Sequence, residues 1–158
     1  MIKRELYMNR IRPFIGGELI KVMTGIRRSG KSVMLELIKE ELAEAGVAPS
    51  QMISINFEDM RYSHLQTATA LHDEIIKRAE GIEGKAYLFF DEIQEVEGWE
   101  KCVNSLRVAL DCDIYITGSN AKLLSGELAT YIGGRYVEFV IYPFSFAEFL
   151  ELLSLIHI

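Results

Sequence analysis

The sequence predicts an α/β fold, a three-layer sandwich in which a mostly parallel five-stranded sheet lies between two layers of helices. Two observations lead to this prediction. Short apolar runs typical of buried strands alternate along the chain with segments whose apolar residues recur every three to four positions, as in helices. In addition, the first apolar run leads through a glycine-rich loop into the first helical segment. Strands separated by helices form parallel sheets through right-handed crossovers, with helices on both faces.

The first strand is expected at Leu19–Thr24, which is short and largely apolar. The helix after the loop carries apolar residues from Met34 to Ala45 on one face and charged residues on the other, and Gly46 ends it. The later elements repeat this alternation. Strands are expected at Gln51–Phe57, Ala86–Phe90, Asp113–Thr117 and Val137–Tyr142, and helices at Leu65–Glu80, Trp99–Leu110 and Leu123–Ile132.

The end of the chain predicts a last helix and a tail. The spacing of Ser145 and Glu148 fits a capping box, so a helix is expected to begin near residue 145. We expect the native domain to span residues 1–152. Residues 153–158 correspond to one reading frame of a common transposon-based sequencing adapter, and we interpret them as a non-native tail. The alternative is a genuine apolar helix end.

The loop between the first strand and helix carries the strongest functional signal. Residues 25–32 read Gly-Ile-Arg-Arg-Ser-Gly-Lys-Ser and fit the pattern G-x-x-x-x-G-K-[ST] without a mismatch. In such loops the backbone N–H groups surround phosphates, the lysine approaches the β and γ oxygens, and the serine hydroxyl can ligate Mg²⁺. Arg27 and Arg28 could add cation to the phosphates, face a partner, or be solvated. The residues expected to hold a nucleoside triphosphate are Gly25, Arg28, Ser29, Gly30, Lys31, Ser32 and Val33.

An acidic pair follows the apolar strand at residues 86–90. Asp91 stands at the strand terminus, where it can hold Mg²⁺ together with Ser32, and Glu92 can orient and deprotonate an attacking water. An acidic turn without chemistry is the alternative, but the spacing from Lys31 favours the catalytic interpretation.

Two further polar residues are candidates for catalysis. Asn120 follows the next strand, and its amide can contact both a phosphate oxygen and water, as a sensor of the γ-phosphate would. Arg135 precedes the last strand and could reach transition-state charge in its own subunit or in a neighbour. A turn opener and a surface arginine are the alternatives.

Composition excludes several classes of protein. The net charge of -6 argues against nonspecific nucleic-acid binding, and no apolar run reaches the length of a membrane span. The N-terminus does not read as a secretory signal, and Cys102 and Cys112 lack metal-ligand spacing. We therefore expect a soluble, cytoplasmic domain with no membrane contact.

Taken together, these motifs resemble the AAA-type ATPases of bacteria and archaea that are described only as ATP-binding proteins, within the AAA+ superfamily. The resemblance is carried by Gly25–Ser32, Leu88–Glu92, Ile116–Asn120, Gly134-Arg135 and residues 142–149. It implies a P-loop NTPase fold with strand order 5-1-4-3-2, and a C-terminal domain that is missing here. It also implies that residues 10–14 lie close to the adenine. The implied site comprises Gly30, Lys31, Ser32 and Asp91 for ATP and Mg²⁺, Glu92 for hydrolysis, Asn120 for sensing and Arg135 acting in trans.

Three functions remain open at this point. The first is an ATPase that couples hydrolysis to a C-terminal module or a protein partner, and that could act as a homo-oligomer through Arg135. The second is a nucleotide-gated interaction module with negligible turnover. The third is a small-molecule kinase, which the pair Asp91-Glu92 and the lack of an Arg-rich lid make less favoured. The sequence contains no N-K-x-D motif that would select guanine.

Overall fold

The computed structural model describes residues 4–119, 123, 132–143, 150 and 153–154. A five-stranded sheet forms its centre, with strand order β2-β3-β4-β1-β5 and every neighbouring pair parallel. This is the order 5-1-4-3-2 read from the other edge, so the predicted fold is confirmed. The strands are β1 (Ile20–Thr24), β2 (Met52–Asn56), β3 (Ala86–Asp91), β4 (Cys112–Gly118) and β5 (Tyr136–Val140).

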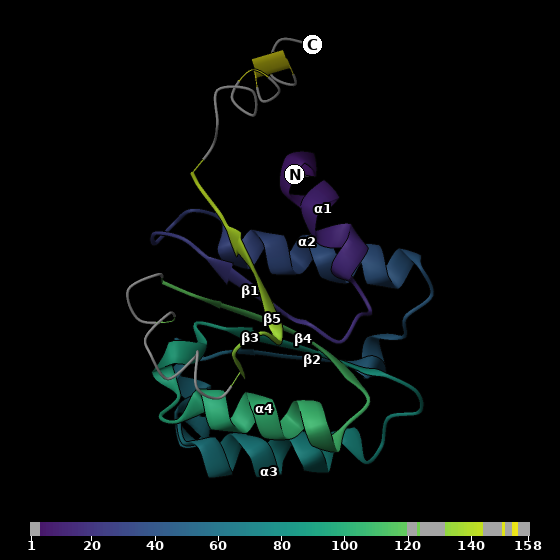
Figure 1. Ribbon diagram of the computed structural model, residues 1–158, viewed down its shortest axis with the longest axis vertical. Coiled ribbons are helices and arrows are strands. Elements are labelled where there is room, and N and C mark those ends of the chain that lie inside the picture. Colours follow the sequence, from purple (N-terminus) through teal and green to yellow (C-terminus); the bar gives the residue numbers. More distant parts are fainter. Residues whose placement is uncertain (1–3, 120–122, 124–131, 144–149, 151–152, 155–158) are drawn as a thin grey trace.

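Two layers of helices cover the sheet, α1 and α2 on one face and α3 and α4 on the other (Figure 1). They are α1 (Glu5–Ile11), α2 (Lys31–Glu44), α3 (Ala68–Ala79) and α4 (Trp99–Ala109). Short 3-10 turns join them to the strands: η1 (Arg12–Phe14), η2 (Pro49–Gln51), η3 (Met60–Leu65) and η4 (Ile93–Glu95). Within the described residues, no helix is both long and apolar enough to cross a membrane.

The strand sequences divide their side chains between two cores. Val22 and Phe90 belong to the core under α3 and α4, whereas their neighbours Met23 and Phe89 belong to the core under α1 and α2. Successive residues of a strand point to opposite faces, so a sheet covered on both sides needs a continuous apolar run. This explains why the run at residues 86–90 has no polar alternation.

Helix α1 was not anticipated from the sequence. It buries Tyr7, Met8 and Ile11 in the same core as Met34 and Leu37 of α2. Only these three positions of a seven-residue helix are buried, which is too short a pattern to be distinguished from a loop. Leu37 is buried in this core, which it shares with Met8 of α1 and Phe139 of β5.

Several predicted elements differ at their ends. The helix expected at residues 65–80 begins at Ala68, because Thr67 caps it by accepting the N–H of Ala70 at 3.3 Å. Of the helix expected at residues 123–132, only Leu123 and Ile132 are described, and both are buried. The start of the helix expected from residue 145 lies outside the described residues, whereas Leu150, Leu153 and Ser154 are helical. The interpretation of residues 153–158 as a non-native tail remains a prediction.

Candidate functional site

The phosphate-type loop lies between β1 and α2, at the carboxyl edge of the parallel sheet. Ligands of open α/β sheets bind at this edge. Gly30 has φ 99° and precedes the first residue of α2, so the loop ends on a helix N-terminus with its free N–H groups and positive dipole. Gly25 packs so closely against the carbonyl oxygen of Ile141 that a Cβ atom would collide with it. Both glycines of the motif are therefore required by the fold.

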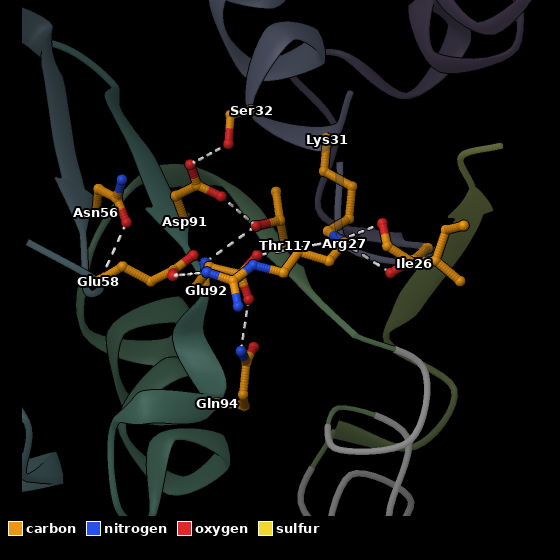
Figure 2. Close-up of polar contacts among 11 residues, drawn as sticks. Ile26, Arg27, Lys31, Ser32, Asn56, Glu58, Asp91, Glu92, Gln94 and Thr117 are labelled. Atoms are coloured by element: carbon orange, nitrogen blue, oxygen red, sulfur yellow. Dashed lines mark hydrogen bonds and ion pairs between the residues drawn. The ribbon is translucent and has the colours of Figure 1, made fainter. Parts of the chain in front are cut away.

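Lys31 folds back over its own loop. Its ammonium donates to the carbonyl oxygens of Gly25 at 2.8 Å and Ile26 at 3.1 Å, and it lies 4.0 Å from Oε1 of Glu92 (Figure 2). The side chain is 5% exposed. Within the described ranges, this buried ammonium bonds to two neutral carbonyls and faces one carboxylate, so it is well placed to receive a phosphate oxygen.

Ser32 and Asp91 meet across the gap between α2 and β3. The Ser32 hydroxyl donates to Oδ2 of Asp91 at 2.6 Å, although the two residues are far apart in the sequence (Figure 2). The other carboxylate oxygen of Asp91 accepts a hydrogen bond from the hydroxyl of Thr117, which lies on β4. One oxygen of Asp91 is thus held by the sheet and the other faces Ser32.

This pair fits the chemistry of Mg²⁺. A hydroxyl and a carboxylate are the hard oxygen ligands that Mg²⁺ prefers, and Mg²⁺ takes few ligands from protein because it keeps waters and substrate phosphates. In the described part of the chain, no group of three or more His, Cys, Asp or Glu side chains could hold a metal ion. The oxygens of Ser32 and Asp91 would therefore hold the ion only together with phosphate and water.

Glu92 sits in the left-handed backbone region, with φ 57° and ψ 49°. A non-glycine residue there is strained, and such strain is concentrated at functional sites. The backbone N–H of Glu92 donates to the Thr117 hydroxyl at 3.0 Å, and its carboxylate oxygen Oε2 accepts from the amide of Gln94 at 2.5 Å. The sharp turn lets Asp91 end the strand while Glu92 faces Lys31.

Lys31, Glu92 and Gln94 line a small pocket of about 160 Å³. Arg27 and Glu58 form an exposed ion pair at 3.6 Å beside it, which contributes little because solvent screens it (Figure 2). The pocket is lined by Arg27, Lys31, Glu58, Glu92, Gln94, Glu95 and Ser119. Ser32 and Asp91 line a second pocket, together with Val33 and Asn56.

Thr117 was missed as a site residue. The sequence places it in a run of polar residues that end a strand, but does not say which of them turns inward. The signal that could have identified it is a hydroxyl within an otherwise apolar, buried run. Because Ile116 pairs with Phe90, the next residue, Thr117, lies level with Asp91.

Arg4 was also missed. Its guanidinium is buried and donates to the carbonyl oxygens of Ser29 and Tyr142, both at 2.6 Å. In a trans peptide the C=O of Ser29 and the N–H of Gly30 point in opposite directions. Arg4 therefore fixes the orientation of one N–H group of the phosphate-type loop and turns it away from α1. A lone arginine near the N-terminus carries no motif that would have indicated this.

Of the predicted catalytic residues, one is not described by the structure and another lies away from the pocket. Asn120 lies outside the described residues, although Ser119 lines the pocket. Arg135 is exposed and precedes β5, and its carbonyl oxygen accepts the N–H of Ile20 at the start of β1. It thus lies at the amino edge of the sheet, about 16 Å from the carboxyl edge for a five-residue strand at roughly 3.3 Å per residue. This placement does not support a contact between Arg135 and the transition state in its own subunit.

The segment expected near the adenine lies at the far end of α2. Arg12 bonds to Glu41 at 2.7 Å and to Glu5 at 2.9 Å. Glu41 is ten residues beyond Lys31, or about 15 Å along a helix at roughly 1.5 Å per residue. The N-terminal residue that contacts the loop is Arg4, which bonds the Ser29 carbonyl. Two of the residues expected to bind the nucleotide are exposed: Arg28 lies on the loop and Val33 in the first turn of α2.

Comparison with known proteins agrees with this geometry. The family model described as "AAA domain" matches residues 17–150. An uncharacterized protein of Haemophilus influenzae is 48% identical over 151 residues, which is 96% of this chain and 38% of that protein. The chain thus spans well under half the length of this relative.

Two solved structures share the fold at low identity. A DNA polymerase III gamma subunit-related protein of Thermotoga maritima superposes with a TM-score of 0.65 and 12% identity, over 94% of this chain and 49% of the other. PCH-2 of C. elegans superposes with a TM-score of 0.61 and 17% identity, over 98% of this chain and 47% of the other. The chain therefore belongs to the AAA domain family, as an AAA-type P-loop ATPase domain.

Proposed function

We propose that the domain binds ATP with Mg²⁺ and hydrolyses it to ADP and phosphate. The observation that carries the proposal is the hydrogen bond of 2.6 Å from the Ser32 hydroxyl to the Asp91 carboxylate. Beside it, the Lys31 ammonium lies 4.0 Å from the Glu92 carboxylate. Lys31 and Ser32 begin α2, and Asp91 and Glu92 stand at the end of β3, so two elements bring these four side chains to one edge of the sheet. Membership in the AAA family supports nucleotide binding.

The residues have separate roles in this reaction. The ammonium of Lys31 exchanges its carbonyl partners for phosphate oxygens, and the N–H groups of the loop bind further phosphate oxygens. Bound Mg²⁺ would neutralise phosphate charge. Glu92 accepts a proton from water as its oxygen attacks the γ-phosphorus, and the bond from that phosphorus to the β–γ bridging oxygen breaks. The electron pair leaves with ADP.

Arg135 and the rest of a longer protein belong to the same proposal. Because Arg135 lies at the edge of the sheet opposite Lys31, it reaches transition-state charge only in a neighbouring copy of a homo-oligomer. The Haemophilus influenzae relative is longer than this chain, and hydrolysis is proposed to be coupled to a C-terminal domain or to a partner. Asn120 is proposed as the γ-phosphate sensor, and the domain is proposed to act in the cytoplasm.

The test separates binding from turnover. Isothermal titration with ATP and GTP, with and without Mg²⁺, is compared between wild type and Lys31→Ala, and phosphate release is compared between wild type and Glu92→Gln. We expect ATP binding to be lost in Lys31→Ala, and phosphate release to fall to background in Glu92→Gln while binding is kept. Unchanged affinity in Lys31→Ala would contradict the site. ATP binding without phosphate release in wild type would favour the nucleotide-gated module, and phosphate transfer to a metabolite would favour the kinase.

A further inference from the structure

Gln94 contacts the proposed catalytic base directly. It lies in η4, two residues after Glu92, and its side-chain nitrogen Nε2 donates to Oε2 of Glu92 at 2.5 Å (Figure 2). We propose that Gln94 is a positioning residue that holds the Glu92 carboxylate for water activation. This inference rests on the proposed hydrolysis and deepens it.

The orientation of the Gln94 amide follows from chemistry. An ionised carboxylate can only accept hydrogen bonds, so the nitrogen of the amide must face Glu92 and the oxygen must face the opposite way. That oxygen, Oε1, is buried and has no hydrogen-bond partner among the described residues. A buried amide oxygen without a partner is unfavourable. The fold tolerates it at a site where the other end of the amide performs a function.

Gly118 provides the space that this amide needs. A Cβ atom at Gly118, the last residue of β4, would collide with Oε1 of Gln94 and would also lie 2.9 Å from Cδ1 of Leu123. Any larger residue at the end of β4 would push the Gln94 amide out of its place. Glycine at this position thus leaves room for both the Gln94 amide and the side chain of Leu123.

Gln94 leaves the rest of Glu92 free for chemistry. Thr117 holds the backbone N–H of Glu92, Gln94 holds Oε2, and Oε1 faces Lys31 at 4.0 Å. A carboxylate has about four lone-pair sites, so one bond from Gln94 still leaves room for a water to donate. Without this bond, the 4.0 Å ion pair with Lys31 would be the one contact among the described residues that holds the Glu92 side chain, and the carboxylate could turn within the pocket.

The kinetic test uses Gln94→Met, which keeps the size of the side chain and removes the donor. We expect kcat for ATP hydrolysis to fall about 10- to 100-fold, since a misplaced catalytic group can cost roughly that much, while the Kd for ATP stays within about twofold. Gly118→Ala is expected to lower kcat similarly, and the double variant to be no worse than the poorer single variant. Gln51→Met is the matched control, because Gln51 is also half-buried and bonds the Lys85 carbonyl at the amino edge of the sheet, opposite the site. Wild-type kcat in Gln94→Met, or a Kd that rises together with the loss of kcat, would overturn the proposal.

A second measurement does not depend on turnover. The side-chain amide signals of Gln94, assigned by their loss in Gln94→Met, are followed by ¹H–¹⁵N NMR in wild type and in Glu92→Ala. We expect one amide proton to be shifted downfield in wild type and to lose this shift in Glu92→Ala. Signals unaffected by Glu92→Ala would overturn the contact. If wild type binds ATP but releases no phosphate, hydrolysis fails as the function, and these signals alone decide whether Gln94 holds Glu92.

Discussion

At the level of single residues, Thr117 joins the two acids of the site. Its hydroxyl donates to Asp91 and accepts the backbone N–H of Glu92, and the residue is fully buried on β4. A residue that bonds a metal-ligating carboxylate fixes its orientation, and loss of such partners costs roughly 10- to 100-fold in metal affinity. Thr117 thus acts on both halves of the proposed chemistry through one oxygen.

We expect Thr117→Val to weaken the Mg²⁺ dependence of ATP binding by about tenfold, since valine keeps the shape and removes both hydrogen bonds. The measurement is the Mg²⁺ concentration that gives half-maximal ATP binding. Thr117→Ser, which keeps the hydroxyl, is expected to behave as wild type. Equal Mg²⁺ dependence in the valine variant would show that the hydroxyl does not orient Asp91.

The two cysteines make a separate prediction at this scale. Both are free thiols, and burial raises the pKa of Cys102 from 9.0 to about 12 and that of Cys112 to about 11. Above about pH 9 the unfolded chain loses thiol protons that the folded chain keeps, so the free energy of unfolding falls as the pH rises. For Cys102 the slope approaches about 1.4 kcal/mol per pH unit. Urea unfolding of wild type and Cys102→Ala from pH 8 to pH 11 measures it, and parallel pH dependences in the two proteins would contradict the prediction.

At the level of elements, α1 connects the phosphate-type loop to the chain that leaves β5. Arg4 bonds the carbonyls of Ser29 and Tyr142 and lies 4.6 Å from the ring centre of Tyr7, whose hydroxyl accepts the N–H of Tyr142 at 3.1 Å. A helix of seven residues would not be stable by itself. The core that α1 shares with α2 and the two hydrogen bonds of Arg4 therefore hold this helix in place. The bond from Arg4 to Ser29 in turn orders the phosphate-type loop.

We expect Arg4→Met to raise the Kd for ATP by about tenfold, because hydrogen bonds from a charged group contribute about 1.5–3 kcal/mol each and part of this orders the loop. Titration calorimetry measures the change. Arg10→Met, on the exposed side of the same helix, is the matched control and is expected to bind ATP as wild type. Equal affinities in the two variants would show that the loop needs no support from α1.

At the level of the whole molecule, a buried ion pair holds the amino edge of the sheet, far from the site. Lys21 of β1 and Asp113 of β4 form a salt bridge with both side chains fully buried. Asp113 also accepts from the N–H of Gly16 at 2.9 Å and from the hydroxyl of Tyr115 at 2.6 Å, and Lys21 donates to the carbonyl of Gly17 at 2.8 Å. Burial lowers the pKa of Lys21, and the charge of Asp113 opposes this. The network ties the loop before β1 to the centre of the sheet.

We expect Lys21→Met to lower the free energy of unfolding by about 3–5 kcal/mol, because it leaves Asp113 as a buried charge without its partner. Urea unfolding at neutral pH measures the loss. Lys77→Met, at an exposed position of α3, is the control. The double variant Lys21→Met with Asp113→Leu is expected to regain part of the stability, since both charges are then removed. A loss in Lys21→Met no larger than in the control would contradict this account.

Most of the fold could be predicted from the sequence because its signals are local. The apolar runs, the helical periodicities and the motif of residues 25–32 each depend on neighbours in the chain. The positions of Lys31, Ser32, Asp91 and Glu92 at one edge follow from strand–helix alternation, which brings the carboxyl ends of parallel strands together. Helix α1 could not be predicted, because three buried residues give too little pattern.

The sequence by itself determined the fold class, the phosphate-type loop and the acidic pair, since each is written in short stretches of adjacent residues. Only the tertiary structure decided which distant groups support them: Arg4 on the Ser29 carbonyl, Thr117 between Asp91 and Glu92, Gln94 over Gly118, and Arg135 at the opposite edge. The physical reason is that these contacts depend on strand register and helix packing, which set distances between residues that no local pattern relates.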